Sequence, residues 1–513
     1  FTLTTGVPNW IDANANASDF ANAGQFAYDV TGGSIAVEGM GIEGTVGRLD
    51  LIGESLAIDA PLRAHYLDGS LSSITLAAGR QRFRQTDAGG VSSQPITNLG
   101  TGNLPGNLPG NNPAGYAIDA TTLGAMRAGQ IHILATEQGL GVNLAGPVAA
   151  FQQGIHLDSA GPVQLRQLAA AGEIQLDSDG NLSIGQDISA GGAIHINSGG
   201  SVNLIGGASA GGDLNLHSAG AIDVRGNLYS GGQVDMATPA NLRLDGTLDA
   251  VDDIHLNSGA LTLNAPLRGS GSLSIDASAD VSLAGAISVG GNANISSGGY
   301  LAIQAPIQAT NDLTLIAEST RISANVTVGH DYNVNASESI TLDGASLAGH
   351  GIRLSSEQLV LNGAIQAPLV NLDSDSLTLG QDGLSIDGNL NLDLRGDFTL
   401  NGPLSVSGDA RIESGGNQHY LSEVQAEGSL ALLAGGNLTL DSNVQAGTQM
   451  ILEAGGDLHL HGAASANAGM RLAAGGKLQA EHAIVAGALD VSAADARFAA
   501  DVAAGGDMRF SVG

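Results

Sequence analysis

Residues 193–212 read AIHINSGGSVNLIGGASAGG, and residues 213–232 read DLNLHSAGAIDVRGNLYSGG. Each stretch alternates apolar and polar residues, turns at small residues, alternates again and closes on Gly-Gly. Alternation with a period of two over four or five residues indicates a strand with one buried face. Gly, Ser, Asn and Asp between the runs suit tight corners, because they tolerate backbone conformations that other residues avoid. Each stretch therefore predicts three short strands joined by corners.

The same unit repeats along most of the chain. From about residue 173 onward the sequence divides into about seventeen units of roughly 18 to 20 residues, with weaker units upstream from residue 130. Three strands per unit, repeated without a change of direction, describe one coil of a parallel β-helix whose coils stack about 4.8 Å apart. In the unit that starts at Asp213, Leu214 and Leu216 are expected to face inward and Asn215 outward. The predicted fold class is all-β, a parallel β-helix (solenoid) of about 20-residue coils.

The composition supports an ordered chain of small and aliphatic residues. Of the 513 residues, 76 are Gly, 43% are hydrophobic and only 3% are aromatic, which excludes both a disordered chain and a typical globular core. The formal net charge of −32 makes nucleic acid and anionic lipid poor partners. The chain has no cysteine, so disulfides and thiolate metal sites are excluded. No stretch approaches the roughly 18 consecutive apolar residues of a membrane-spanning helix.

Several stretches near the N-terminus carry a family resemblance. FTLTTGVPNW (1–10), AYDVTGGSIAVEGMGIEG (27–44) and LDLIGESLAIDAPLRA (49–64) resemble the later part of the two-partner-secretion (haemagglutination activity) domain. That domain heads filamentous haemagglutinins and contact-dependent growth inhibition proteins. GYAIDATTLGAMRAGQIHILATEQGLGVNLAG (115–146) resembles the segment that joins it to the haemagglutinin repeats, and the units that follow resemble those repeats. The resemblance places the family's N-terminal asparagine motifs before Phe1.

The resemblance implies a domain organisation and a function. Residues 1–78 would be the C-terminal part of the secretion domain, packed coaxially on a right-handed β-helical shaft formed by residues 115–513. The chain would be a monomeric rod, secreted to the outer surface of a Gram-negative bacterium through an outer-membrane two-partner-secretion transporter. Its function would be the stiff shaft of an adhesin that attaches to host-cell receptors, neighbouring bacteria or exopolysaccharide in a biofilm matrix. The alternatives are the shaft of a contact-dependent growth inhibition effector with a C-terminal toxin and, remotely, a β-helix polysaccharide lyase.

The segment 79–114 interrupts the repeat pattern. It contains four prolines and many Gly and Asn residues, which predicts a loop outside the coil stack with neither strand nor helix. Arg80, Arg82 and Arg84 form a basic cluster in an otherwise acidic chain. We interpret this cluster as a solvated edge; the alternative is a contact for the secretion partner or for an acidic glycan.

The candidate binding site is the tripeptide Arg395-Gly396-Asp397, which integrins recognise when it lies in an exposed loop. In register with the other units it occupies a corner where the fold demands Gly, so a structural corner is the competing interpretation. His459 and His461, with Asp441 and Glu481 in adjacent coils, could bind zinc but more simply form a solvated ladder. His330 and His350 at successive corners receive the same interpretation.

Catalysis finds little support in the sequence. In the first eight units from residue 173 the third residue is expected to face outward, and no charge is concentrated there: these residues are Gln175, His195, Asn215, Asp235, His255, Ser274, Asn294 and Thr314. Phosphate loops, nucleophile elbows and metalloprotease motifs are absent from the sequence. We therefore expect no enzymatic activity, no cofactor and no metal site.

Overall fold

The structure is a computed structural model that describes residues 1–10, 26–65, 71–86, 90–96, 115–380 and 383–513. These residues form two compact units, Phe1–Gly269 and Ser270–Gly513. Every regular element in the described ranges is a β-strand. The strands form about 23 turns of a parallel β-solenoid with about 20 residues per turn, which confirms the predicted fold class.

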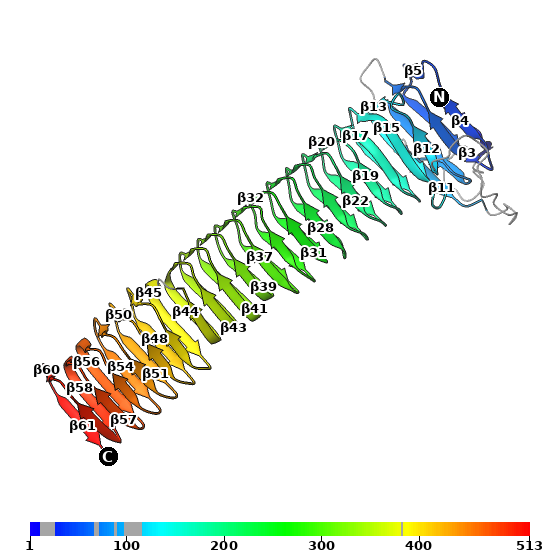
Figure 1. Cartoon of the computed structure of the whole chain (residues 1–513). Helices are drawn as coiled ribbons and strands as arrows, with labels where there is room; N and C mark the ends of the chain where they lie inside the picture. Colours follow the sequence, from blue (N-terminus) through cyan, green and yellow to red (C-terminus); the bar gives the residue numbers. More distant parts are fainter. Residues whose placement is uncertain (11–25, 66–70, 87–89, 97–114, 381–382) are drawn as a thin grey trace, which may run out of the picture. The chain divides into compact units, whose positions relative to one another are not determined.

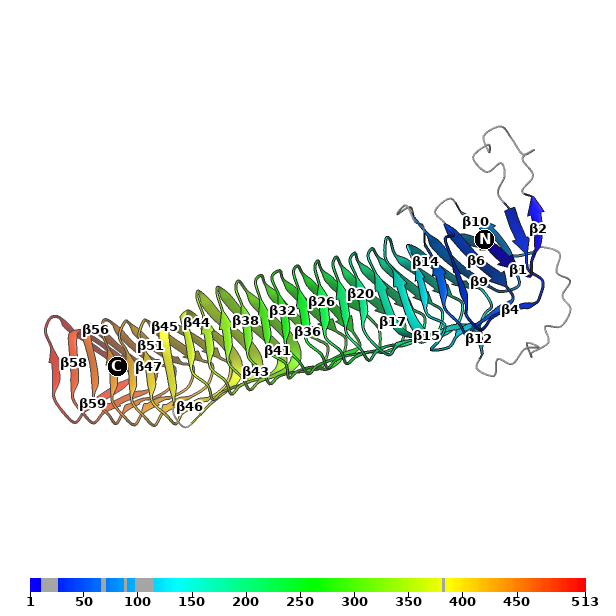
Figure 2. The same cartoon turned by 90° about the horizontal axis from the view of Figure 1, so that it is seen from above.

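Coils in the first unit begin well before the visible sequence repeat (Figures 1 and 2). Strands of residues 34–78 pair in parallel with strands of residues 116–135: Leu56 lies opposite Ile118, and Ile74 lies opposite Ile131. The two segments therefore belong to one coil stack within this unit. The coil strands before the regular repeat are β1 (Thr2–Thr4), β4 (Ser34–Val37), β5 (Ile42–Gly44), β6 (Arg48–Gly53), β7 (Ser55–Ile58), β8 (Leu62–Ala64), β9 (Ser73–Ala78), β12 (Tyr116–Ala120), β13 (Met126–Ala128), β14 (Gln130–Ala135), β15 (Gly141–Ala150), β16 (Ile155–Ser159) and β17 (Val163–Ala170).

From residue 174 the first unit repeats three strands per coil, as predicted. Leu214 is fully buried while Asn215 is partly exposed, so the inward and outward faces also agree with the prediction. The strands, taken coil by coil, are β18 (Ile174–Ser178), β19 (Leu182–Ile184), β20 (Ile188–Ala190); β21 (Ile194–Ser198), β22 (Val202–Leu204), β23 (Ala208–Ala210); β24 (Leu214–Ser218), β25 (Ile222–Val224), β26 (Leu228–Ser230); β27 (Val234–Ala237), β28 (Asn241–Leu244), β29 (Leu248–Ala250); β30 (Ile254–Ser258), β31 (Ala260–Leu263) and β32 (Leu267–Gly269).

A ladder of buried hydroxyl groups runs along one corner of these coils. Ser178, Ser198 and Ser218 each end the first strand of a coil and are nearly fully buried. Each hydroxyl donates a hydrogen bond to a glycine carbonyl oxygen of the preceding coil, over 2.9, 2.8 and 2.6 Å respectively. A buried polar group is costly unless it is hydrogen-bonded, so these bonds let a small polar corner lie inside the stack.

The second unit contains coils in which two strands merge. Short strands are β33 (Leu273–Ala277), β34 (Val281–Leu283), β35 (Ile287–Val289), β36 (Ala293–Ser297), β37 (Tyr300–Ile303), β38 (Ile307–Ala309), β40 (Val326–Val328), β42 (Ser346–Ala348), β47 (Leu404–Val406), β48 (Ala410–Ser414), β50 (Val424–Ala426), β51 (Leu430–Ala434), β53 (Val444–Ala446), β54 (Met450–Ala454), β60 (Val502–Ala504) and β61 (Met508–Val512). The merged strands are β39 (Leu313–Ile322), β41 (Asp331–Leu342), β43 (Gly351–Leu361), β44 (Ile365–Leu379), β45 (Leu384–Leu394), β56 (Ala464–Ala474) and β58 (Ile484–Ala493). A separate six-stranded sheet consists of β46 (Phe398–Leu400), β49 (Gln418–Tyr420), β52 (Leu438–Leu440), β55 (Leu458–Leu460), β57 (Lys477–Ala480) and β59 (Asp495–Phe498).

The prediction of three short strands is therefore wrong for several coils of this unit. β39 and β41 contain no glycine, and β43 has glycine only at its first residue. Without glycine at the first corner the backbone stays extended, and the pairing of β39 with β41 shifts register between Ala317 and Ser319. A β-bulge thus makes the bend that Gly-Gly makes elsewhere.

An antiparallel sheet lies outside the coil stack of the first unit. It contains β2 (Val7–Trp10), β3 (Phe26–Asp29), β10 (Arg82–Gln85) and β11 (Val91–Gln94), in the order β11-β10-β3-β2. The prediction that residues 79–114 form no strand is wrong for β10 and β11; residues 87–89 and 97–114 lie outside the described residues. Phe83 of β10 is fully buried and packs with Val30, Ile52 and Ala77. β10 and β11 form a hairpin, and β10 also pairs with β3. This long-range pairing cannot be recognised from the local composition of residues 79–114.

Two buried tyrosines of the second unit give a matched test of core polarity. The hydroxyl of Tyr332 is fully buried and has no hydrogen-bond partner within the described chain, whereas Tyr420 donates to Oε1 of the buried Gln418 over 2.9 Å. An unpaired buried polar group costs about 1–3 kcal/mol. Tyr332→Phe should therefore raise the local free energy of unfolding by about 1 kcal/mol, and Tyr420→Phe should lower it by about 1–3 kcal/mol.

Hydrogen exchange of the surrounding strands measures both effects, because long repeat proteins need not unfold in a two-state manner. A loss of protection in both variants would contradict the assignment of Tyr332 as unpaired.

Candidate functional site

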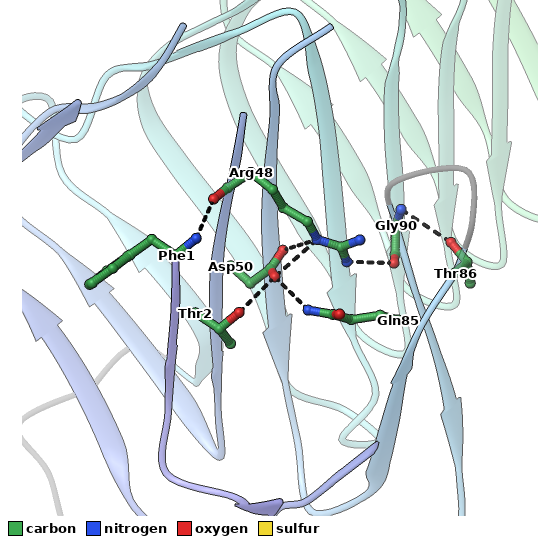
Figure 3. A network of polar contacts seen from close by, with 7 residues as sticks. All are labelled: Phe1, Thr2, Arg48, Asp50, Gln85, Thr86 and Gly90. Atoms are coloured by element: carbon green, nitrogen blue, oxygen red, sulfur yellow. Dashed lines mark hydrogen bonds and ion pairs between the residues drawn. The ribbon is translucent and has the colours of Figure 1, made fainter. Parts of the chain in front are cut away.

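A polar network of the first unit centres on Asp50 (Figure 3). Asp50 lies in β6 and is fully buried. Its carboxylate accepts hydrogen bonds from Nε of Arg48 at 2.8 and 3.0 Å, from the hydroxyl of Thr2 at 3.0 Å and from Nε2 of Gln85 at 2.8 Å. Arg48 also donates through Nη2 to the carbonyl oxygen of Gly90 over 3.0 Å. The network therefore joins β1 and β6 of the coil stack to β10 and to the start of β11.

The arginine cluster of residues 80–84 belongs to the same junction. Nε of Arg80 donates to Glu54 over 2.6 Å, and Glu54 also accepts from the backbone nitrogen of Gly33. Arg82 forms a two-pronged pair with Asp29 at 2.5 and 2.7 Å, and this hydrogen bond raises the pKa of the Arg82 guanidinium. Paired, partly buried charges of this kind fix geometry between two segments. Our interpretation of the cluster as a solvated edge is therefore wrong for Arg80 and Arg82.

His132 lies in β14, beside this junction. Burial, then the neighbouring His156 and Arg48, lower the pKa of His132 to about 4 from an ordinary value of 6.5. The ring centroids of His132 and His156 are 6.0 Å apart, and Nε2 of His132 is buried with no hydrogen-bond partner among the described residues. The folded chain therefore holds His132 as the neutral imidazole.

This lowered pKa predicts a loss of stability in acid. The unfolded chain binds a proton near pH 6.5 and the folded chain only near pH 4, so stability is complete above pH 6.5 and falls between these values. The loss should reach about 3 kcal/mol for the strands around β14. His132→Gln should remove this pH dependence in hydrogen exchange. Asp158, whose pKa is raised by burial and by Asp177, acts in the opposite direction and remains in both proteins, so the difference isolates His132.

The corners carry ladders of Asp and Asn side chains that bond one coil to the next. In the second unit Oδ1 of Asp397, Asn417, Asn437 and Asp457 each accepts a hydrogen bond from the backbone nitrogen found 20 residues later, over 2.6, 2.8, 2.8 and 2.7 Å. In the first unit Asn181 accepts from Ser201 in the same way, over 2.9 Å. These bonds satisfy corner N–H groups that would otherwise lack a partner.

Arg395-Gly396-Asp397 occupies such a corner. Arg395 and Asp397 are exposed, and Nη1 of Arg395 lies 2.7 Å from Oδ1 of Asp375. Oδ1 of Asp397 accepts from both the backbone nitrogen and Nδ2 of Asn417, at 2.6 and 3.1 Å. Phe398 follows directly and is buried against Tyr420, so the tripeptide is tied to the stack on its C-terminal side.

Because Asp397 bonds the next coil, we expect the tripeptide to act as a corner and not to bind a receptor. Asp397→Glu should leave host-cell binding unchanged while weakening local hydrogen-exchange protection around Asn417 by a fraction of a kcal/mol to about 1 kcal/mol. The measurement is adhesion of cells that display the variant, compared with Asp457→Glu as a control, which changes an equivalent corner outside the tripeptide. Lost adhesion with the fold intact in Asp397→Glu alone would identify a receptor site.

The histidine corner forms an alternating ladder of imidazoles and carboxylates. Nε2 of His419 lies 2.7 Å from Asp441, which is 4.0 Å from Nε2 of His461. His461 lies 3.2 Å from Glu481 through Nδ1, and the rings of His459 and His461 are 6.2 Å apart. At the other candidate pair, Nδ1 of His350 lies 2.7 Å from Asp331, and the backbone of His350 bonds that of His330.

These contacts match the ladder interpretation of the histidines. In the part of the chain that the structure describes, no group of three or more His, Cys, Asp or Glu residues could hold a metal ion. Nor does any helix there have the length and hydropathy needed to cross a membrane.

Comparison with known proteins finds two matching repeat families and several similar proteins. Residues 306–467 match the hemagglutinin repeat family, and residues 251–304 match a family of repeats of unknown function. The tRNA nuclease CdiA of Yersinia mollaretii is 26% identical over 344 residues, which cover 65% of this chain and 10% of the relative. The toxin CdiA of Escherichia coli is 35% identical over 144 residues, which cover 28% of this chain and 4% of the relative.

These matches support the filamentous haemagglutinin and contact-dependent growth inhibition family. A second Escherichia coli relative, a tRNA nuclease CdiA, is 30% identical over 189 residues, covering 37% of this chain and 4% of the relative. The chain thus spans a tenth or less of the length of these relatives. No solved structure matches it.

The family match separates the candidate residues into two groups. Arg395, Asp397, His419 and His461 all lie inside the matched haemagglutinin repeats, where the coil itself explains their positions. The Asp50 network lies outside that match and was not predicted from the sequence. In β6, residues on both faces of the strand are buried, because a second sheet covers the outer face. The network can be recognised only once that second sheet is known.

Proposed function

We propose that the chain is part of the shaft of a secreted filament on the outer surface of a Gram-negative bacterium. The observation that carries this proposal is a stack of parallel coils with an aliphatic interior, built from repeats that match the haemagglutinin family. Such coils supply length and stiffness, because each one contacts only its neighbours and can be repeated. A dedicated outer-membrane two-partner-secretion transporter would export the chain, as the family relationship suggests.

Attachment is the first candidate role of the filament. A shaft with outward polar residues on every coil can contact host cells, neighbouring bacteria or exopolysaccharide along its length. We propose no catalytic role for this segment, since the outward rows carry mixed polar residues and no concentrated carboxylates. Neither the repeat match nor the named relatives support the polysaccharide lyase alternative.

Presentation of a toxin is the second candidate role. Two of the relatives above are named tRNA nucleases and one is named a toxin. If this chain serves a similar protein, its shaft would hold a toxic domain at a distance from the producing cell.

Removing whole coils tests the shaft function. In-frame deletion of residues 409–468 removes three coils and rejoins Gly408 to Gly469 in phase, because β48, β51, β54 and β56 are equivalent by register. The matched control, deletion of residues 409–458, breaks the phase. We expect the first variant to be displayed on cells and to retain attachment, and the second to lose display.

Attachment to epithelial cells and killing of neighbouring bacteria in co-culture then distinguish the two roles. Lost attachment or killing in the in-phase variant, with display intact, would contradict a spacer function for these coils.

A further inference from the structure

Two large apolar side chains in the first unit depart from the residues that their repeat normally uses. Ile205 follows the second strand of its coil, where the neighbouring coils have Gly185 and Arg225. Tyr229 is the outward residue of β26, in register with Ser209 below it and Asp249 above it. Both side chains are 48% exposed. Because neither side chain fills the core or forms the corner, the fold itself does not require a large apolar residue at either position.

The two departures line the same groove. This groove, of ≈ 670 Å³, crosses four successive coils at the corner between the second and third strands. β26 and β20 mark its position in Figure 2. Gly206 and Gly226 form its floor. A Cβ atom on either residue would lie 2.2 Å from the backbone of the preceding coil, so a side chain is excluded at both positions. Tyr229 and Ile205 therefore stand beside a backbone floor that no side chain fills.

The polar groups of the groove are held in place by the corner ladders. Oδ1 of Asp187 accepts a hydrogen bond from the backbone nitrogen of Gly207 over 2.8 Å, and Oδ1 of Asn227 accepts from that of Thr247 over 3.0 Å. Among the described residues no group bonds Oδ2 of Asp187 or Nδ2 of Asn227. One acceptor and one donor of fixed position thus remain for a ligand, which lowers the entropic cost of binding.

We propose that this groove binds a segment of a neutral polysaccharide. The phenol ring of Tyr229 offers a flat apolar face for the C–H face of a pyranose ring, while Asp187 and Asn227 pair with its hydroxyl groups. Asp187 and Asp249 line the groove, and the chain carries a net charge of −32, so an anionic glycan is repelled. Arg268 lies 3.5 Å from Asp249, but this exposed pair screens the carboxylate only weakly. The inference rests on the proposed attachment function and names its partner class.

Binding of defined oligosaccharides by the 513-residue chain tests the proposal. Immobilised linear hexasaccharides of glucose, galactose, mannose and N-acetylglucosamine serve as neutral probes, with a heparin hexasaccharide as the anionic probe and a Leu- and Phe-rich peptide as the apolar one. We expect at least one neutral probe to bind and the heparin probe not to bind. Tyr229→Ala should weaken binding by about tenfold, whereas Tyr229→Phe, which keeps the ring, should stay within about threefold of the parent.

Tyr300→Ala is the matched control, because Tyr300 is 42% exposed but lies in the second unit. Circular dichroism and thermal melting verify that all variants are folded. Three outcomes would overturn the proposal: no neutral probe binds, the heparin hexasaccharide or the peptide binds instead, or Tyr229→Ala and Tyr300→Ala behave alike. If glycan binding fails while displayed filaments still attach to cells, the groove assignment is wrong and the attachment function stands.

Discussion

Asp50→Ala should destabilise the N-terminal coils by about 3–5 kcal/mol, since removing one member of a buried ion pair leaves its partner uncompensated. The Asp50 side chain is 1% exposed and that of Arg48 26% exposed, so Arg48 would keep its charge with little access to water. Thr2 and Gln85 would lose their acceptor at the same time. The strands that lose protection from hydrogen exchange should be β1, β6 and β10, because the carboxylate joins these three.

The matched control is an exposed ion pair of the same unit. Arg63 and Glu43 lie 3.4 Å apart with side chains more than half exposed, and Glu43→Ala should cost less than about 1 kcal/mol. Asp50→Asn keeps the shape of the side chain and should fall between the two. Equal losses of protection in Asp50→Ala and Glu43→Ala would show that the network does not hold the antiparallel sheet to the coils.

Leu214→Ala should cost about 2–5 kcal/mol, and the loss should stay within a few coils. Leu214 is fully buried. In the parallel register it lies between Ile194 of the preceding coil and Val234 of the following coil. Truncation leaves a cavity that stacked strands cannot close, because each of them is fixed by hydrogen bonds on both sides. Hydrogen exchange should report the loss in β21, β24 and β27.

Asn215→Ala, the next residue along the same strand, provides the control. The Asn215 side chain is partly exposed, and its Nδ2 lies 2.9 Å from Nδ1 of His195. Its loss should stay within about 0.5 kcal/mol. Equal effects of the two substitutions would mean that the strand is shifted by one residue, which would reverse both faces.

The regular coils were predictable because their information is local. Alternation in residues 213–232 assigns each side chain to a face, and Gly, Asp or Asn at fixed offsets assigns the corners. The same reasoning failed where a distant segment decides the structure. In β6 the residues Leu49, Asp50 and Leu51 are all buried, because the coil interior covers one face and the antiparallel sheet covers the other. β10 and β11 were missed for the same reason, since β10 joins this hairpin to β3, which lies more than 50 residues away in the sequence.

The candidate site was predicted in position but not in its contacts. The exposed corner at Arg395 and Asp397 follows from the register of the repeat. The bond between Asp397 and Asn417 was not foreseen, although the period contains the signal: residues 397, 417, 437 and 457 are all Asp or Asn. The Tyr229 groove was missed because a single aromatic residue carries no period, and its exposure could be recognised only against the equivalent residues of the stacked coils.

The corner ladders give the coil stack a direction. In each bond the acceptor is a side chain of the earlier coil and the donor is the backbone of the later one, as for Asn437 and Asp457. The end of the stack that faces the later coils therefore presents side-chain oxygens as acceptors, and the end that faces the earlier coils presents backbone N–H groups as donors. A coil added at the first end brings N–H groups to waiting acceptors, and a coil added at the second end brings acceptors to waiting N–H groups. The ladder thus makes the two ends of a coil stack chemically different, so that one end cannot pair with a copy of itself through these bonds.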